Sequence, residues 1–282
     1  DLRLPPQKLV AKALSQRPFI RMSPAMFLPF AYGFCTRVPT AFDKLSFCCL
    51  WLLPLWFACR APLPPFLLAA GAQYALYELG YLQNDFLTVR RERQPHYRLP
   101  SKERARLKPG PLALSRALWA AVFLLLLFVL PLGVPLHWLR FLLALLVLCL
   151  FFLAHNLVRS RWNMLTYFLL CSAKYAALPA LFLPASQACA VWLAFFACFV
   201  LPRSLEHCAK PKYRTFLCGR LCPARFRAAW DFFAALSGAF FLPDFPQYSL
   251  FLWYYAFRTG CLAAAETWGD PRKKIDEAGA QW

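Results

Sequence analysis

The sequence predicts an all-α membrane protein, a polytopic bundle of eight to nine helices around a central cavity that is open to the cytoplasmic side. Of its 282 residues, 60% are hydrophobic and 17% are aromatic, and the mean hydropathy is +0.45. This composition is too apolar for a soluble domain. Several apolar runs approach the roughly 20 residues that a helix needs to cross a bilayer, and an open strand cannot satisfy its backbone in lipid.

Nine apolar segments are candidates for these helices. Their connections are short, so we expect one integral-membrane domain over residues 1–282 with no soluble appendage. The segments are residues 19–36, 45–59, 63–84, 113–135, 137–157, 163–184, 187–202, 228–243 and 247–265.

Basic residues, which give the chain a net charge of +19, cluster in particular loops. The positive-inside rule places these clusters in the cytoplasm, whereas the turns at 132–135, 184–187 and 243–246 carry almost no positive charge and face the other side. We therefore expect a protein of the inner (cytoplasmic) membrane with these clusters on its cytoplasmic side. The expected cytoplasmic segments are an N-terminal segment 1–18, a first loop 85–112, a second loop 203–227 and a tail 266–282.

The N-terminal third requires one adjustment to this topology. Its basic residues favour a cytoplasmic start, but three full crossings before Asp85 would then place Asp85 on the wrong side. Segment 45–59 is short and leads into a proline-broken stretch at 59–65, so we interpret it as a re-entrant or interfacial element. The result is eight crossings with both termini in the cytoplasm.

Three carboxylates form a polar stripe at the end of an apolar run. Glu78, Asp85 and Glu92 are seven residues apart, nearly two helical turns, so they share one helix face with Tyr81 and Thr88 between them. Ionisable side chains within a membrane are costly and are usually functional. This stripe is therefore the main candidate site.

Two other uses of the basic and cysteine-rich loops are less consistent with the sequence. A pI near 9.8 would suit nucleic-acid binding, but the basic loops are short, lie between spans and contain no nucleic-acid module, so we expect no nucleic-acid partner. A structural zinc site is the alternative for one loop, although its adjacent His and Cys and its Cys-x-x-x-Cys spacing are unfavourable. The four residues concerned are His207, Cys208, Cys218 and Cys222.

The run from Asn84 to Glu92, followed by Pro95, Arg98 and Leu99-Pro100-Ser101, resembles the first aspartate-rich motif of the UbiA superfamily of intramembrane prenyltransferases. That motif reads Asn-Asp-x-x-Asp-x-x-x-Asp and often leads into an Arg-Pro-Leu-Pro-Ser type of loop. In this chain Thr88 replaces the middle aspartate and Glu92 replaces the last.

The family also has a second aspartate-rich motif in a later cytoplasmic loop, and this chain has no aspartate counterpart there. Glu206 is the only carboxylate in the corresponding run, residues 201–213. The resemblance therefore covers a short, correctly placed motif together with the order of the apolar segments.

The resemblance implies a Mg2+-dependent transferase in which the metal holds a diphosphate leaving group, since Mg2+ prefers oxygen ligands and bridges to phosphates. It also implies that loops 85–112 and 203–227 are the first and second catalytic loops, with the active site facing the cytoplasm. Asp85, Glu92 and Glu206 would be the metal ligands, and Asn84 and Thr88 would hold a phosphate oxygen or a metal-bound water. Basic side chains would neutralise phosphate where carboxylates are missing. The further substrate-binding candidates are Arg98, Lys174, Arg203, Lys210, Lys212 and Tyr213.

Glu78 has two interpretations that the sequence leaves open. It either pairs with a cation inside the bundle and fixes helix packing, or acts with Asp85 and Glu92 in catalysis as a general base on the acceptor. Its expected partner is Lys174 or Arg258, since both lie inside apolar segments where a cation either faces a cavity or extends to the interface.

Three functions remain open from the sequence. The first is a transferase that moves a prenyl group from a polyprenyl diphosphate to a small acceptor, the activity we favour by analogy with the family. The second is a phosphoribosyltransferase that moves phosphoribose from phosphoribosyl diphosphate to a polyprenyl phosphate. The third is a non-catalytic transporter or assembly factor. The expected partners of the enzyme are a membrane lipid or polyprenyl substrate and an anionic diphosphate.

Overall fold

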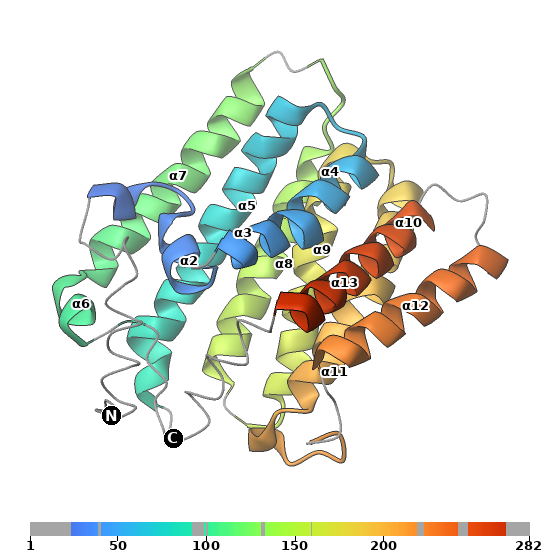
Figure 1. Ribbon diagram of the computed structural model, residues 1–282. Helices are drawn as coiled ribbons and strands as arrows, with labels where there is room; N and C mark the ends of the chain where they lie inside the picture. Colours follow the sequence, from blue (N-terminus) through green and yellow to red (C-terminus); the bar gives the residue numbers. More distant parts are fainter. Residues whose placement is uncertain are drawn as a thin grey trace, which may run out of the picture.

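The structure is a computed structural model that describes residues 24–38, 41–91, 99, 101–130, 133–158, 160–218, 223–241 and 248–268 (Figure 1). The regular structure of these residues is helical throughout, which confirms the predicted all-α class. The longest helices are α5 (Leu63–Gln83), α7 (Pro109–Val129), α8 (Trp138–Leu157), α9 (Asn163–Phe182), α12 (Pro223–Phe241) and α13 (Tyr248–Trp268).

Shorter elements join end to end or lie between the long helices. Three of them are π-helical turns, η2 (Cys48–Leu52), η3 (Asn84–Thr88) and η5 (Phe196–Val200), which continue a preceding helix without a break. The remaining elements are η1 (Pro24–Phe27), α2 (Ala31–Thr36), α3 (Ala41–Phe47), α4 (Leu53–Cys59), η4 (Val89–Arg91), α6 (Ser101–Arg106), α10 (Ala185–Phe195), α11 (Leu201–Cys208) and η6 (Pro211–Tyr213).

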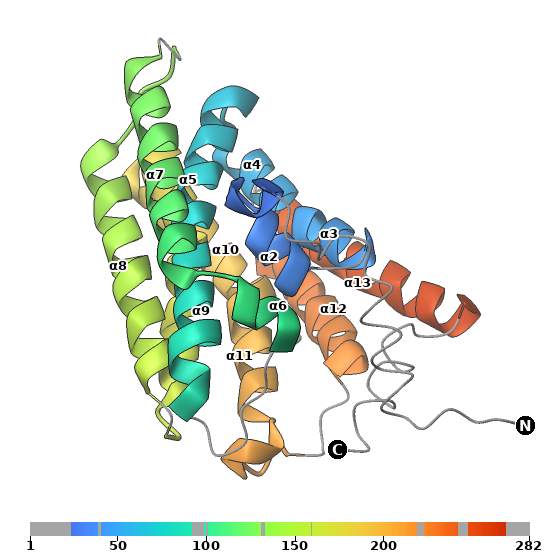
Figure 2. The same ribbon diagram turned by 90° about the vertical axis from the view of Figure 1, so that its left-hand side faces the viewer.

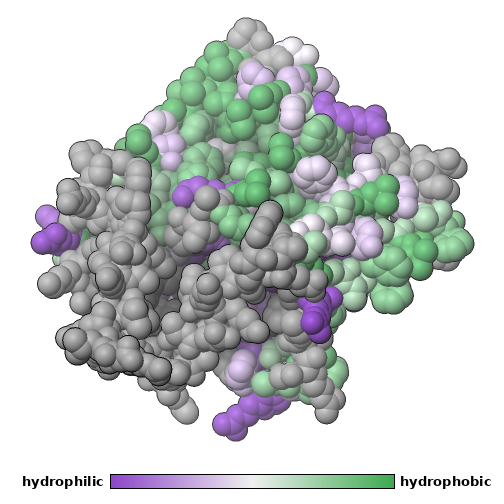
Figure 3. Space-filling view, in the orientation of Figure 1, coloured by the Kyte–Doolittle hydropathy of each residue, from purple (hydrophilic) through white to green (hydrophobic). Residues whose placement is uncertain are grey.

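Five helical segments of the described chain are long and apolar enough to span a membrane, which indicates an integral membrane protein. Their outer faces carry exposed leucines and phenylalanines, such as Phe128 on α7 and Leu139 on α8. Figure 3 shows hydrophobic residues covering the upper part of the visible face. The five segments are Phe42–Cys59, Pro109–Val129, Trp138–Leu157, Asn163–Phe182 and Ala185–Cys208.

The structure corrects the interpretation of the N-terminal third. The segment predicted to be re-entrant, 45–59, lies inside one continuous helix from α3 through η2 to α4, and this helix is long enough to span. The described part of the first apolar segment forms only η1 and α2, of four and six residues. Hydropathy counted its apolar residues but not Pro24, Pro29 and Gly33, which interrupt or weaken a helix.

Proline-rich junctions end one helix and start the next. After α4 the chain turns at Arg60, whose φ of 49° is left-handed, and α5 begins with prolines in its first turn. Proline is tolerated there because the first helical N–H groups have no partner within the helix. The proline-broken stretch is therefore a tight turn between two helices.

The π-helical turn η2 is anchored by side chains from two other helices. Tyr175 of α9 and Tyr254 of α13 both donate hydrogen bonds to the carbonyl oxygen of Leu50, at 3.0 and 2.6 Å, and the Trp253 indole donates to Cys49 O at 2.7 Å. A π turn leaves carbonyl groups without their usual helical partner, and these donors satisfy them. The core is therefore fixed around η2.

The parts of the chain that carry the predicted loops lie at one end of the bundle. Figures 1 and 2 show the end of α5, the region of α11 and the start of α12 at the lower end. The turns after α4 and α7 lie at the opposite end in both views.

Candidate functional site

Asp85 lies in η3, directly after α5, and is buried. Its Oδ2 accepts a hydrogen bond of 2.8 Å from the Tyr32 hydroxyl, and its Oδ1 forms an ion pair of 2.7 Å with Arg37. The pKa of the Tyr32 hydroxyl is raised, first by burial and then by the Asp85 carboxylate, so this hydroxyl stays protonated and donates. The segment around α2 thus caps the carboxylate.

The surroundings of Asp85 complete a compact polar group. Asn84 Nδ2 donates to Asp85 Oδ1 at 3.1 Å, and the Thr88 hydroxyl donates to Asn84 O at 3.3 Å. The Arg37 guanidinium lies 4.4 Å from the centre of the Tyr81 ring, a cation–π arrangement that orients it. The three first-motif residues predicted to cooperate, Asn84, Asp85 and Thr88, do lie together.

Glu78 pairs with a cation that the sequence did not suggest. Its Oε2 lies 2.6 Å from Arg116 Nε, both side chains are fully buried, and the backbone N–H of Gly33 donates to Oε1 at 2.5 Å. The expected partner Lys174 or Arg258 is therefore wrong, and Arg258 pairs instead with Asp231 at 3.6 Å. Arg116 also donates to Met26 O at 2.5 Å and Phe27 O at 3.0 Å, so the Glu78–Arg116 pair holds the N-terminal segment against α5 and α7.

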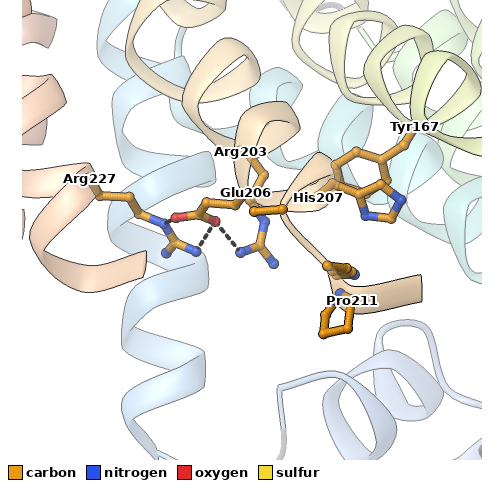
Figure 4. Close-up of a pocket in the computed structure, with 8 residues that line it drawn as sticks. Tyr167, Arg203, Glu206, His207, Pro211 and Arg227 are labelled. Carbon is orange, nitrogen blue, oxygen red and sulfur yellow. Dashed lines mark hydrogen bonds and ion pairs between the residues drawn. The ribbon is translucent and has the colours of Figure 1, made fainter. Parts of the chain in front are cut away.

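Glu206 is held by two arginines from different helices, as the dashed lines in Figure 4 mark. Arg203, one turn earlier on α11, donates to Glu206 Oε2 at 3.0 Å. Arg227 of α12 donates to both carboxylate oxygens through Nε and Nη2, a bidentate arrangement. Glu206 therefore orients both guanidinium groups and links α11 to α12.

A buried hydrogen-bond chain lies beside this group. The Tyr213 hydroxyl donates to Asn163 Oδ1 at 2.5 Å and lies 2.7 Å from His207 Nε2. The Tyr167 and His207 rings stack with centroids 3.9 Å apart. These contacts bind α9, α11 and η6 together and give His207 and Tyr213 fixed positions.

A pocket of about 290 Å3 opens between these elements. It is lined by three cationic side chains, Arg203, Lys210 and Arg227, and by one carboxylate, Glu206. The Arg203 side chain is 44% exposed, so its guanidinium remains accessible although it contacts Glu206. The other lining residues are Tyr167, His207, Ala209 and Pro211.

Lys174 lies in an aromatic environment inside the bundle. Its Nζ is 4.7 Å from the centre of the Trp51 ring, 5.1 Å from that of Tyr77 and 5.8 Å from that of Phe47, rings that come from η2, α5 and α3. The residue is half-buried, and cation–π contact stabilises its charge. Lys174 thus faces the bundle interior, one of the two predicted alternatives.

Several predicted residues lie where the structure gives no side-chain description. Glu92, Arg98 and Cys222 are outside the described residues, and Lys212 lies in η6 but its side chain is not described. The predicted pairing of Asp85 with Glu92 therefore stays a prediction. Within the described part of the chain, no group of three or more His, Cys, Asp or Glu residues could hold a metal ion.

The described residues do not fit the Mg2+ site that the resemblance implies. Mg2+ needs oxygen ligands in near-octahedral geometry, but both oxygens of Asp85 are bound by Tyr32 and Arg37, and both oxygens of Glu206 are bound by Arg227. Arginine side chains and the neutral Tyr32 hydroxyl thus occupy the two described carboxylates that were predicted to bind the metal, Asp85 and Glu206.

Sequence reasoning missed the basic partners of these carboxylates. Arg227 falls inside the predicted second loop, but nothing local separates it from the other basic residues there. Arg116 gave a usable signal, because it lies inside the predicted apolar segment 113–135, where a cation needs a partner. Arg37 directly follows the first apolar segment, 19–36, and the sequence gave no signal that it pairs with a buried carboxylate.

No protein-family model, curated protein or solved structure matches the chain. The likeness to the UbiA superfamily therefore rests on the motif residues and on the order of the apolar segments in the sequence.

Proposed function

We propose that this protein is a membrane-embedded transferase that transfers a prenyl group from a polyprenyl diphosphate to a small acceptor. The observation that carries the proposal is the pocket lined by Arg203, Lys210 and Arg227, at the end of a set of apolar helices. A substrate with an anionic head and a hydrocarbon tail has the matching chemistry, since its tail suits the lipid and its head suits the basic pocket.

The arginines suit a diphosphate for a geometric reason. A guanidinium presents several N–H donors in one plane and binds phosphate oxygens through two parallel hydrogen bonds. Glu206 fixes the orientation of Arg203 and Arg227 before a ligand arrives, so little ordering of these side chains remains to be done on binding.

In prenyl transfer the bond between the allylic carbon and the diphosphate oxygen breaks, and its electron pair leaves with the diphosphate. The acceptor forms a new bond to the electron-poor carbon and loses a proton. Fixed positive groups around the departing oxygen stabilise the charge that develops there. In this proposal Arg203, Arg227 and Lys210 perform that role.

A second candidate is phosphoribosyl transfer from phosphoribosyl diphosphate to a polyprenyl phosphate. This reaction has two highly anionic substrates, so it needs two separate basic sites. The pocket at Lys210 supports it as a phosphate site, and we assign Lys174, located among Phe47, Trp51 and Tyr77, to the second substrate.

The topology of the proposed enzyme follows from the charge distribution. We propose eight crossings in the inner (cytoplasmic) membrane, with both termini and the pocket on the cytoplasmic side. α11 and the start of α12, which carry Arg203 and Arg227 of the pocket, lie at the same end of the bundle as the end of α5, which supports this orientation (Figures 1 and 2).

The experiment that tests the function is diphosphate release by the purified protein. Polyprenyl diphosphate with an aromatic acceptor and phosphoribosyl diphosphate with polyprenyl phosphate are supplied in parallel, each with and without Mg2+. Release with the first pair supports prenyl transfer, and release with the second supports the phosphoribosyl alternative. No release with either pair, together with an unchanged melting temperature when diphosphate is added, contradicts an enzyme and favours a transporter or assembly factor.

A further inference from the structure

Buried carboxylates in the described part of the chain share one property: each contacts an arginine. Glu78 contacts Arg116, Asp85 contacts Arg37, Glu206 contacts Arg203 and Arg227, and Asp231 contacts Arg258. Removing one partner of such a pair leaves an uncompensated charge in a medium of low dielectric constant, so these contacts are costly to break.

The pair at Asp85 opposes a divalent cation directly. Arg37 is only 11% exposed, lies 2.7 Å from Oδ1 and is held from the other side by the Tyr81 ring. A Mg2+ ion at Asp85 would have to displace this guanidinium or lie beside it, and like charges at such a distance repel strongly in a buried site. Asp85 is thus already neutralised.

Glu206, in the region of the second predicted loop, is neutralised by arginines in the same way as Asp85. Arg227 binds both oxygens of Glu206, and Arg203 shares Oε2. The pocket is lined by three cations and one carboxylate, so its net charge is two positive units when His207 is counted as neutral. This net charge equals that of one Mg2+ ion.

We infer that the pocket of Arg203, Lys210 and Arg227 binds a diphosphate group without a divalent cation. The arginines and the lysine supply the positive charge that Mg2+ supplies where carboxylates line a phosphate site. This inference rests on the proposed function, because it takes the diphosphate as the ligand of this pocket.

The test is the equilibrium binding of inorganic pyrophosphate to the full chain in lipid nanodiscs. The buffer is either freed of divalent cations with EDTA or supplemented with Mg2+. We expect the dissociation constants in the two buffers to agree within about threefold, which corresponds to less than about 1 kcal/mol.

Two variants assign the binding to the pocket. Lys210 is exposed, so Lys210→Gln should fold normally, and we expect it to weaken pyrophosphate binding roughly threefold to tenfold in both buffers, the range for a charge-assisted contact at an accessible site. Lys108→Gln removes an exposed lysine outside the pocket and should leave binding unchanged.

The outcomes separate the inference from the function. Pyrophosphate binding that appears only with Mg2+ overturns the inference and leaves the proposed function standing. Suppose that pyrophosphate binds without Mg2+ and that Lys210→Gln and Lys108→Gln bind it equally strongly. This result also overturns the inference, because the anion then binds outside the pocket. Absence of binding in both buffers overturns the proposed function together with the inference.

Discussion

At the scale of single residues, arginines determine the state of the buried acids. The Glu78–Arg116 pair is the most enclosed of these contacts, with both side chains fully buried, and Arg116 also satisfies two carbonyls of the N-terminal segment. Such a pair contributes little net stability compared with an apolar pair, but breaking it is expensive. Glu78 therefore has a structural function whether or not it also takes part in chemistry.

Arg116→Leu tests this contact. It leaves the Glu78 carboxylate buried without its cation, so we expect a loss of about 3–5 kcal/mol of stability, the range for removing one partner of a buried ion pair. Unfolding of the purified protein in detergent, followed by circular dichroism, measures the change. Arg106→Leu is the control because Arg106 is exposed at the end of α6. Equal stability of the two variants would show that the pair is unimportant.

At the scale of elements, close helix packing brings the polar groups together. The ring of Phe152 on α8 lies against Gly80 on α5, so close that a Cβ added at Gly80 would overlap it. The same approach lets Asn156 of α8 donate to Gly80 O at 2.8 Å. This contact fixes the end of α5, and with it the position of Asp85 in η3.

Gly80→Ala should therefore destabilise the protein, although alanine is the better helix former. Overlap with a packed ring costs typically about 1–3 kcal/mol. Gly110→Ala is the matched control, because no atom lies within 4 Å of a Cβ added there, and it should change the stability by less than about 0.5 kcal/mol. Equal losses of stability in the two variants would contradict overlap with the Phe152 ring as the cause.

The elements show what the sequence could and could not predict. The long helices were predictable because their apolar runs approach the roughly 20 residues that a helix needs to span a bilayer. The first apolar segment was not, since hydropathy ignores the prolines and Gly33. The grouping of Asn84, Asp85 and Thr88 followed from helical spacing, whereas Arg37, Arg116 and Arg227 lie 48, 38 and 21 residues from their partners. Which side chains pair over such separations depends on how neighbouring helices are rotated against each other. This rotation cannot be inferred from the residues close to either partner in the sequence.

At the scale of the whole molecule, the basic pocket and the turn between α9 and α10 lie at opposite ends of α9, because Tyr167 near the start of α9 lines the pocket and Leu183 follows the end of this helix. We propose that the pocket end faces the cytoplasm. Ser160 precedes α9, and Ser186 lies in the first turn of α10, which follows α9. Both residues are exposed, so they mark the two ends of α9.

Single cysteines at these two positions test the orientation. In a background without the native cysteines, a membrane-impermeant maleimide added to intact cells should label Ser186→Cys and not Ser160→Cys. Permeabilised cells should label both. The reverse pattern in intact cells would show that the protein has the opposite orientation, and labelling of both positions would show that α9 does not cross the membrane.

The central claim is that the diphosphate of the substrate binds in the pocket formed by Arg203, Lys210 and Arg227. The measurement that tests it most directly is the dissociation constant of a prenyl diphosphate for Arg227→Gln, compared with Arg225→Gln, an exposed arginine two residues earlier on α12. We predict that the first variant weakens binding by roughly tenfold or more, as expected for a lost bidentate contact, and that the second leaves it unchanged. Equal affinities of the two variants, with both proteins folded, would contradict the claim.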